Sequence, residues 1–469
     1  MSIEMKNIKI KQEFAIKTPA ELDKLSHEEL LKYIKDLQKR LVKEKPKKNS
    51  SNSSIAPSTD MTKPEKNQTL REESDRKVGG QQGREGKNLA QTDEPDSVVE
   101  LDFNIENCKN CGTSLEEIEK ELKERRQVLD LELAKIETEI TEYQSFSKIC
   151  PVCGFENHDN DFPHLVAPHI SYGVNITAIV AYLSVSQYLP YNRIVSLISN
   201  LFKVNISYGV IDKMIKRASS LSENEIKNIV EELELSEIVG IDETGCKVDG
   251  KKYWHWTFQN EQNTLIVASQ SRGKKVINET FEDGFVNACV VHDNYSSYNS
   301  LVTSKEQLCL AHKLRDLNYA IACDDTQVMK DLKSTIKEAM IDHKENFTMG
   351  QREILKKEYE KILEHLLLQE ATPKSETEKQ LNSFRKAHEK NQIFTFLEHP
   401  NIPPDNNGSE RAIRNVKVKI KVSGQFKSFQ GAKDYASLRS IVDTSRKRDL
   451  NEFDSLVRVI SGNSVFLLE

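Results

Sequence analysis

The sequence lacks any apolar run long enough to cross a membrane. Its most hydrophobic stretch, residues 176–185, is about half as long as the roughly 20 residues that a membrane-spanning helix needs. The N-terminus, MSIEMKNIKIK, also lacks the apolar segment of a secretory signal. These absences argue against a membrane or secreted protein, and we expect the protein to stay in the cytoplasm.

A surplus of positive charge is missing as well. The formal net charge is −6. The length of 469 residues predicts about two to four domains, and the low hydrophobic content of 37% indicates a globular core diluted by polar helices and linkers. The charge is unevenly distributed. Residues 96–142 contain fourteen acidic and six basic residues, whereas residues 411–448 contain eleven basic and two acidic residues. The second segment is therefore a candidate for contact with phosphate groups.

The cysteines do not form the pattern of a disulfide framework. Of the eight, four lie in two C-x-x-C-G motifs, which favours a metal site in a reducing compartment. Four thiolates at this spacing suit one structural Zn²⁺. The 38 residues between the motifs exceed the usual spacing, and we attribute them to an inserted helix near 115–126 and a strand near 135–143. The alternative is unpaired core thiols. The predicted ligands are Cys108, Cys111, Cys150 and Cys153.

Two apolar segments each lead into an aspartate. The run IVGI precedes Asp242 and a turn-like Gly245, and the run VNACVVH precedes Asp293. Both runs are typical of buried strands, in which an unpaired charge costs several kcal/mol. Two such strands can bring their carboxylates around one hard cation. The alternative is that each aspartate caps a strand or a turn.

A third carboxylate follows a helix-start signal. The segment PDNNGS precedes Glu410, and two strand carboxylates with one helix carboxylate are what two-metal phosphoryl transfer needs. On a helix, Asn406, Glu410, Arg414 and Lys417 share one face, so the amide can orient the carboxylate while the cations hold phosphates. The alternative is an exposed helix with an ordinary Glu–Arg pair. Glu243 is left out because it follows Asp242 directly and points to the other strand face.

The elements around Asp242 follow a definite order. Residues 253–258 and 264–268 are predicted strands, residues 272–275 begin a helix, and the strand before Asp293 comes next. This order matches a ribonuclease-H-like core. The charged, helical residues 330–386 lie between Asp293 and the third carboxylate, which predicts an all-helical insertion.

The N-terminal half contains helices and a linker. Leucines and isoleucines at spacings of three and four predict an amphipathic helix over residues 20–44, which either pairs as a coiled coil or docks on its own domain. Residues 45–91 are polar and are expected to be disordered in isolation. Helices are predicted over 175–189, 193–202 and 207–221, the last two with helix-turn-helix proportions. The phosphate contacts predicted on the last helix are Lys213, Lys216 and Arg217.

Read in order, these motifs are recognisable. IDETGCKVDGKKYWHW, VVHDNYSSY, LCLAHKLRD and PDNNGSERAIR resemble the motifs of the insertion sequence 66 transposase family, and the resemblance extends to GGQQGREGKNL and both C-x-x-C motifs. It implies a ribonuclease-H-like DDE enzyme that cleaves and transfers DNA strands. Two Mg²⁺ (or Mn²⁺) ions would be held by Asp242, Asp293 and Glu410. The implied substrate is double-stranded DNA, at the element ends and at the target.

The resemblance also implies roles for residues near this site. Cys309 and His312 form a C-x-x-H of the kind found in related transposases, and we expect them, with Asn406, to support the active site. The DNA contacts predicted after the third carboxylate are Arg411, Arg414, Lys417, Lys419 and Lys421. The expected partners are a second copy or a higher oligomer and accessory proteins of the same element, with nucleoid association in a bacterial cytoplasm.

The predicted fold class is multidomain, with a ribonuclease-H-like α/β catalytic core that contains a helical insertion. The predicted segments are a zipper-like helix (1–44), a basic linker (45–100), a zinc-binding module (101–165), a helix-turn-helix-like region (166–235), the first part of the core (236–325), the helical insertion (326–390), the catalytic glutamate helix (391–425) and a basic C-terminal region (426–469). Two rival functions stay open. One is a non-catalytic, zinc-containing DNA-binding regulator, and the other is a nuclease of the same fold.

Overall fold

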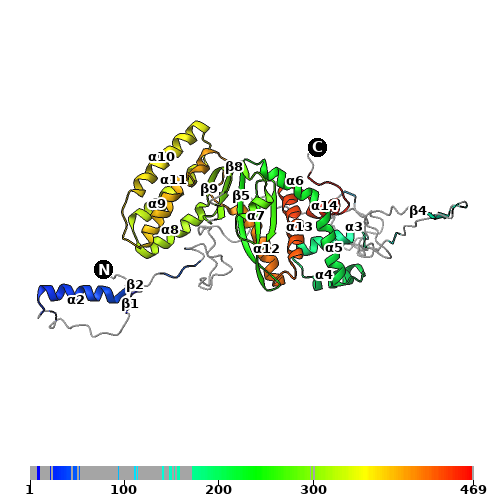
Figure 1. Ribbon diagram of the computed structural model, residues 1–469, viewed down its shortest axis with the longest axis horizontal. Helices are drawn as coiled ribbons and strands as arrows, with labels where there is room; N and C mark the ends of the chain where they lie inside the picture. Colours follow the sequence, from blue (N-terminus) through cyan, green and yellow to red (C-terminus); the bar gives the residue numbers. More distant parts are fainter. Residues whose placement is uncertain are drawn as a thin grey trace. The chain divides into compact units, whose positions relative to one another are not determined.

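The structure is a computed structural model (Figure 1) that describes residues 172–466, except 296, 299 and 300, and short parts of the preceding chain. The chain divides into two units, Met1–Lys63 with Tyr143–Glu469, and Pro64–Glu142. The described parts before residue 172 are 8–10, 22, 25–43, 46–49, 52, 93–94, 110–111, 114, 140–141, 147–149, 151, 153 and 156–158. No helix in these described parts of the chain is long and apolar enough to cross a membrane.

The N-terminal helix is shorter than the sequence predicts. Helix α2 covers His27–Arg40, and the chain continues as strand β2 (Leu41–Lys43), which pairs with β1 (Ile8–Ile10). Ser26 begins the helix because its side chain and backbone N–H both bond to Glu29, one turn later. A second small hairpin joins β3 (Ser147–Ile149) to β4 (Glu156–His158). The helix predicted near 115–126, the strand near 135–143 and the linker at 45–100 lie outside the described residues, apart from isolated positions.

A mixed five-stranded sheet forms the centre of the larger unit, drawn in green in Figure 1. The strand order is β7-β6-β5-β8-β9, in which β5, β6 and β7 are antiparallel neighbours and β8 and β9 run parallel to β5. The strands are β5 (Ile238–Val248), β6 (Lys251–Gln259), β7 (Thr264–Ser269), β8 (Phe285–His292) and β9 (Thr303–Leu308), with helix α7 (Lys275–Thr280) between β7 and β8. This mixed α/β sheet confirms the α/β class predicted for the core.

The turn predicted at Gly245 is wrong. Strand β5 continues through Gly245 to Val248 and pairs along its length with β6. The reversal lies at Asp249 and Gly250, where φ is +47° and +75°. An Asp-Gly pair with two positive φ angles is the preferred two-residue hairpin turn, because its twist matches that of the strands. As a consequence Asp242 lies in the middle of a long strand rather than at its end.

Helices cover the antiparallel half of the sheet and share one hydrophobic core with it. They are α3 (Val174–Val185), α4 (Tyr191–Phe202), α5 (Tyr208–Leu221), α6 (Glu223–Glu234), α13 (Phe429–Lys447) and α14 (Glu452–Ile460). The first three agree with the helices predicted from the sequence. Helix α13 protects the β7 edge, because Ser440 and Thr444 accept hydrogen bonds from strand N–H groups over 2.8 and 3.1 Å.

The parallel half of the sheet is attached to a second, separate core made of helices. These are α8 (Leu310–Asp324), α9 (Gln327–Asp342), α10 (Met349–Leu367), α11 (Glu376–Glu389) and the short 3₁₀ helix η3 (Thr395–Glu398), as predicted for residues 330–386. Gln307 of β9 joins the two parts, because its amide donates to the Ile393 carbonyl and accepts from the Phe396 N–H. The chain then returns to the sheet through α12 (Asn407–Ser423).

Candidate active site

The start of helix α12 docks closely on strand β5. A Cβ atom on Gly240 would lie 2.6 Å from Ser409 Oγ and 2.5 Å from Gln259 Nε2, which is closer than real Cβ contacts allow. A Cβ atom on Gly408, on the helix side, would likewise lie 2.6 Å from Gln259 Nε2. Two glycines therefore let α12 approach the sheet. The side chain of Asn406 fixes this approach by donating a 2.6 Å hydrogen bond to the Ile241 carbonyl.

Strand register brings Asp242 and Asp293 to neighbouring positions. Gly240 of β5 pairs with Val291 of the parallel strand β8, and each aspartate follows two residues later. Neighbouring strands lie about 4.8 Å apart, so the two carboxylates come from adjacent chain segments, at the point where β8 ends beside the middle of β5. One oxygen of Asp242 accepts from the Glu243 N–H over 2.9 Å, and one oxygen of Asp293 accepts from the Tyr295 N–H over 3.0 Å.

The electrostatics of both aspartates show a crowded acidic site. Burial raises the pKa of Asp242 well above its ordinary value, and the negative charges of Asp293, Glu243 and Glu410 raise it further. Burial also raises the pKa of Asp293, followed by the charge of Glu243. The backbone N–H groups act in the opposite direction but do not reverse either shift. Groups with pKa values perturbed by both burial and like charge are typical of functional sites.

Glu410 reaches this site from the first turn of α12. Its backbone N–H donates to the carbonyl of Asn406, and its carboxylate lies 3.9 Å from His312 Nε2 and 3.9 Å from Arg414 Nη2. The charge of Glu410 raises the pKa of Asp242, and Asn406 holds the start of α12 on β5, so the three carboxylates named from the sequence lie in one part of the molecule. Glu398, the nearest glutamate upstream of Glu410, is engaged elsewhere, because it pairs with Lys305 and Lys356.

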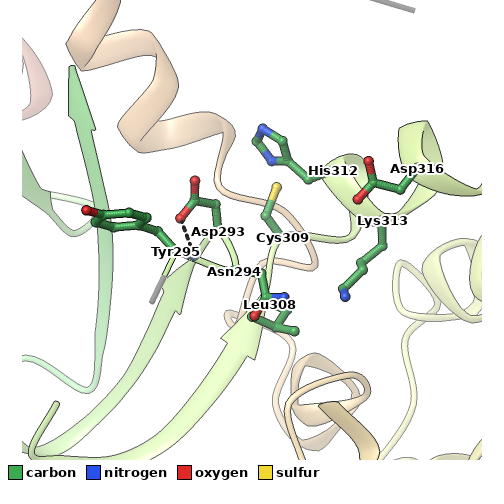
Figure 2. Close-up of a pocket in the computed structure, with 8 residues that line it drawn as sticks. All are labelled: Asp293, Asn294, Tyr295, Leu308, Cys309, His312, Lys313 and Asp316. Carbon is green, nitrogen blue, oxygen red and sulfur yellow. Dashed lines mark hydrogen bonds between the residues drawn. The ribbon is translucent and has the colours of Figure 1, made fainter. Parts of the chain in front are cut away.

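A cavity of about 250 Å³ opens beside Asp293 (Figure 2). Cys309, His312 and Lys313 line it from the start of α8, and Asn294 and Tyr295 line it from the loop after β8. The Cys309 thiol accepts a hydrogen bond from the Asn406 N–H over 3.2 Å, which ties α8 to the start of α12. The C-x-x-H motif thus lies next to the carboxylates, as expected from the sequence.

Sequence reasoning missed Glu243. Its side chain is only 1% exposed and accepts hydrogen bonds of 2.9 and 2.6 Å from Arg272, whose guanidinium lies 3.8 Å from the centre of the Tyr295 ring. Tyr298 also donates to Glu243. Tyr298 reaches Glu243 directly from the segment that follows Asp293, and Tyr295 reaches it through Arg272. The adjacent residues Asp242 and Glu243 were a local signal for a second carboxylate here.

The predicted phosphate contacts on α12 divide into two groups. Arg411, Arg414, Lys417 and Lys421 are exposed. Lys419 is buried, and its ammonium donates to the Ser184 carbonyl over 3.0 Å. Burial lowers the pKa of Lys419 to about 8. We therefore remove Lys419 from the proposed set, because this face of α12 packs against α3.

The cations of α5 point away from its packed face. Ile211, Met214, Ile215 and Ala218 are buried, whereas Lys213 and Lys216 are exposed and Arg217 is half-buried. Lys216 forms an ion pair of 2.9 Å with Asp212. Helix α4 ends at Lys203 in a left-handed conformation, and Ser207 caps the start of α5. DNA binding by this pair of helices stays a prediction.

The predicted zinc ligands are only partly described. Cys111 and Cys153 are exposed, and Cys108 and Cys150 lie outside the described residues. The structural Zn²⁺ therefore stays a prediction.

The comparisons with known families agree with this arrangement. The model of the family described as "Transposase IS66 family" matches residues 169–434, which include the whole sheet, the helical insertion and α12. A family of unknown function (DUF6444) matches residues 5–90. No curated protein matches the chain. Since the first match covers more than half of the sequence, the chain belongs to the IS66 family of transposases.

Proposed function

We propose that this transposase cleaves DNA strands at the ends of its element and joins them to target DNA, with Asp242, Asp293 and Glu410 as the catalytic carboxylates on a ribonuclease-H-like core. One observation carries the proposal. Asp242 and Asp293 follow paired positions of the adjacent strands β5 and β8, and Asn406 holds the start of the helix that carries Glu410 on β5, so the three carboxylates are neighbours. Isolated structural carboxylates do not need such neighbours, whereas carboxylates that share divalent cations do.

The residues present fit a hard divalent cation. Carboxylate oxygens are the ligands that Mg²⁺ prefers, and each aspartate uses one oxygen for a backbone N–H and keeps another for a ligand. Oε1 of Glu410 is buried and forms no hydrogen bond within the described part of the chain. When bound, a pair of Mg²⁺ or Mn²⁺ ions would activate a water or a 3′-hydroxyl as the nucleophile and would stabilise the leaving 3′-oxygen.

The chain's own residues supply position and charge. Asn406 holds the start of α12 on β5 and so fixes the distance between Glu410 and the two aspartates. Arg411, Arg414, Lys417 and Lys421 project from the exposed side of the same helix, and we assign them to the phosphates of the bound strands. The exposed lysines of α5, Lys213 and Lys216, are the proposed contacts to the element ends.

Substitution of the aspartates tests this assignment. Asp242→Asn and Asp293→Asn keep the size of each side chain but remove the charge, so we expect each to abolish Mg²⁺-dependent cleavage and joining while DNA binding is retained. The double variant should lose little more than either single variant, because members of one catalytic unit are not additive. Normal cleavage by either single variant would contradict the assignment, and a wild-type protein that binds DNA without cutting would favour the regulator.

A further inference from the structure

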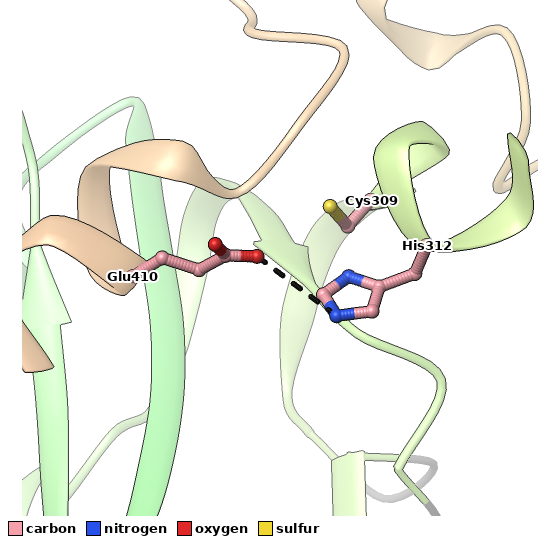
Figure 3. A group of neighbouring side chains, drawn as sticks. All are labelled: Cys309, His312 and Glu410. Carbon is pink, nitrogen blue, oxygen red and sulfur yellow. Dashed lines mark ion pairs between the residues drawn. The ribbon is translucent and has the colours of Figure 1, made fainter. Parts of the chain in front are cut away.

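The side chains of Cys309, His312 and Glu410 gather at one point (Figure 3). Each offers one ligand atom, and these atoms all lie within 4.8 Å of one another. Cys309 is the residue before α8, and His312 is in its first turn, so the two side chains lie on the same end of that helix. Glu410 approaches them from α12.

Polar atoms of this cluster lack partners. Glu410 Oε1 and His312 Nδ1 are both buried and without a hydrogen bond in the described residues. A buried acceptor or donor without a partner destabilises the folded protein, and more so when it is charged. His312 Nε2 lies 3.9 Å from Glu410 Oε1, which is too long for a hydrogen bond. A bound ion between the two side chains would therefore satisfy both groups at once.

The chemistry of the three ligand atoms indicates which cation the cluster would bind. Thiolate, imidazole and carboxylate together are typical of Zn²⁺, whereas Mg²⁺ takes oxygen ligands. Tetrahedral ligands of Zn²⁺ are about 3.5 Å apart, given metal–ligand distances of 2.0–2.3 Å. Side-chain movements of about 1 Å would bring the three ligand atoms to that spacing. The cavity, which Cys309 and His312 also line, leaves room for a water as fourth ligand.

We propose that Cys309, His312 and Glu410 form a binding site for a thiophilic divalent cation of the Zn²⁺ class, separate from the C-x-x-C motifs. Binding breaks the S–H bond of Cys309, forms an S–Zn bond and releases the proton to solvent. Glu410 is a ligand in this set and a catalytic carboxylate in the proposed function. As far as that function holds, Zn²⁺ withdraws Glu410 from the Mg²⁺ site and inhibits cleavage.

Equilibrium dialysis of the full-length protein against Zn²⁺ tests the site without DNA. We expect the wild-type chain to bind one Zn²⁺ more than Cys309→Ser or His312→Ala does. If the variants still bind that ion, the wild type should bind it about tenfold or more tightly than they do. Cys246→Ser is the matched control, because that thiol is buried in β5 and belongs to no such cluster among the described residues. Loaded with Co²⁺, the wild-type protein should show a thiolate charge-transfer band that weakens in Cys309→Ser and not in Cys246→Ser.

Equal Zn²⁺ binding by the wild type, Cys309→Ser and His312→Ala would overturn the proposal. Thermal melts establish that each variant is folded, and the second variant decides the question if the first does not fold. A cleavage assay in Mg²⁺ with added Zn²⁺ then tests inhibition, which Cys309→Ser should relieve. Absence of any cleavage would contradict the proposed function, but the dialysis result would still decide whether the metal site exists.

Discussion

The side-chain amide of Asn406 donates a 2.6 Å hydrogen bond to the carbonyl of Ile241, the residue before Asp242. This single contact joins the helix that carries one carboxylate to the strand that carries another. The Asn406 N–H also donates to Cys309 Sγ, so the same residue positions the start of α8. Residues more than 160 positions apart in the sequence are therefore held together by one buried asparagine.

Gly240→Ala should disturb this junction. The new methyl group would meet Ser409 Oγ and Gln259 Nε2 at about 2.6 Å, so these two side chains must move. Because Ser409 is fully buried in the first turn of α12, we expect the start of the helix and Glu410 to move with it. We expect a loss of about 1–3 kcal/mol in the free energy of unfolding, as for other overpacked sites, and a larger proportional loss of cleavage. Urea unfolding and a strand-cleavage assay measure the two effects. Gly350→Ala is the control, because nothing lies within 4 Å of its Cβ, and normal cleavage by Gly240→Ala would count against the close approach.

The metal-free protein should be stabilised by Asp242→Asn at neutral pH. The pKa of Asp242 is raised in the folded protein, so between the unfolded value near 4 and the folded value the native state binds more protons. Stability of the wild type relative to the variant therefore falls as the pH rises through this interval. Thermal melts in a chelator should show a higher Tm for the variant at pH 8 and a smaller difference at pH 4. A lower Tm for the variant at pH 8 would disprove this account of the carboxylate cluster.

Glu243→Gln should weaken metal binding without removing a catalytic carboxylate. The Glu243 charge raises the pKa of both aspartates, and its loss also releases Arg272 as an uncompensated cation nearby. We expect the Mg²⁺ concentration needed for half-maximal cleavage to rise on the order of several-fold, with the maximal rate largely kept. Glu279→Gln is the control, since that side chain is exposed and pairs with Lys275. An unchanged Mg²⁺ requirement would limit Glu243 to a structural role.

The lysines of α12 should differ in their effect on DNA binding. Lys417 and Lys421 are exposed, so Lys417→Gln and Lys421→Gln should each reduce the salt slope of binding by about 1. Lys419 is buried against α3, so Lys419→Gln should lower thermal stability and leave the slope unchanged. Salt titrations of DNA affinity distinguish the two classes. If all three variants kept the salt slope of the wild type, α12 would not contact phosphate.

How far the sequence predicted this site depends on the range of the interactions. Asp242, Asp293 and Glu410 could be named because each follows a local signal, an apolar strand or a helix start. The hairpin turn was placed wrongly because glycine, as at Gly245, is a common turn residue. The turn lies instead at Asp249 and Gly250, whose φ angles are left-handed. The burial of Lys419 depends on packing between α12 and α3, which has no local pattern. Glu243 joins the site only through residues some 30 to 55 positions away.

The most direct test of the catalytic carboxylates compares Glu410→Gln with Glu398→Gln in Mg²⁺-dependent cleavage of a duplex that carries an element end. Both changes remove one carboxylate charge, but Glu398 lies in η3, where it pairs with Lys305 of β9 and Lys356 of α10. We predict that Glu410→Gln binds the duplex and does not cut it, whereas Glu398→Gln cuts it at close to the wild-type rate. Cleavage at the wild-type rate by Glu410→Gln would contradict the account.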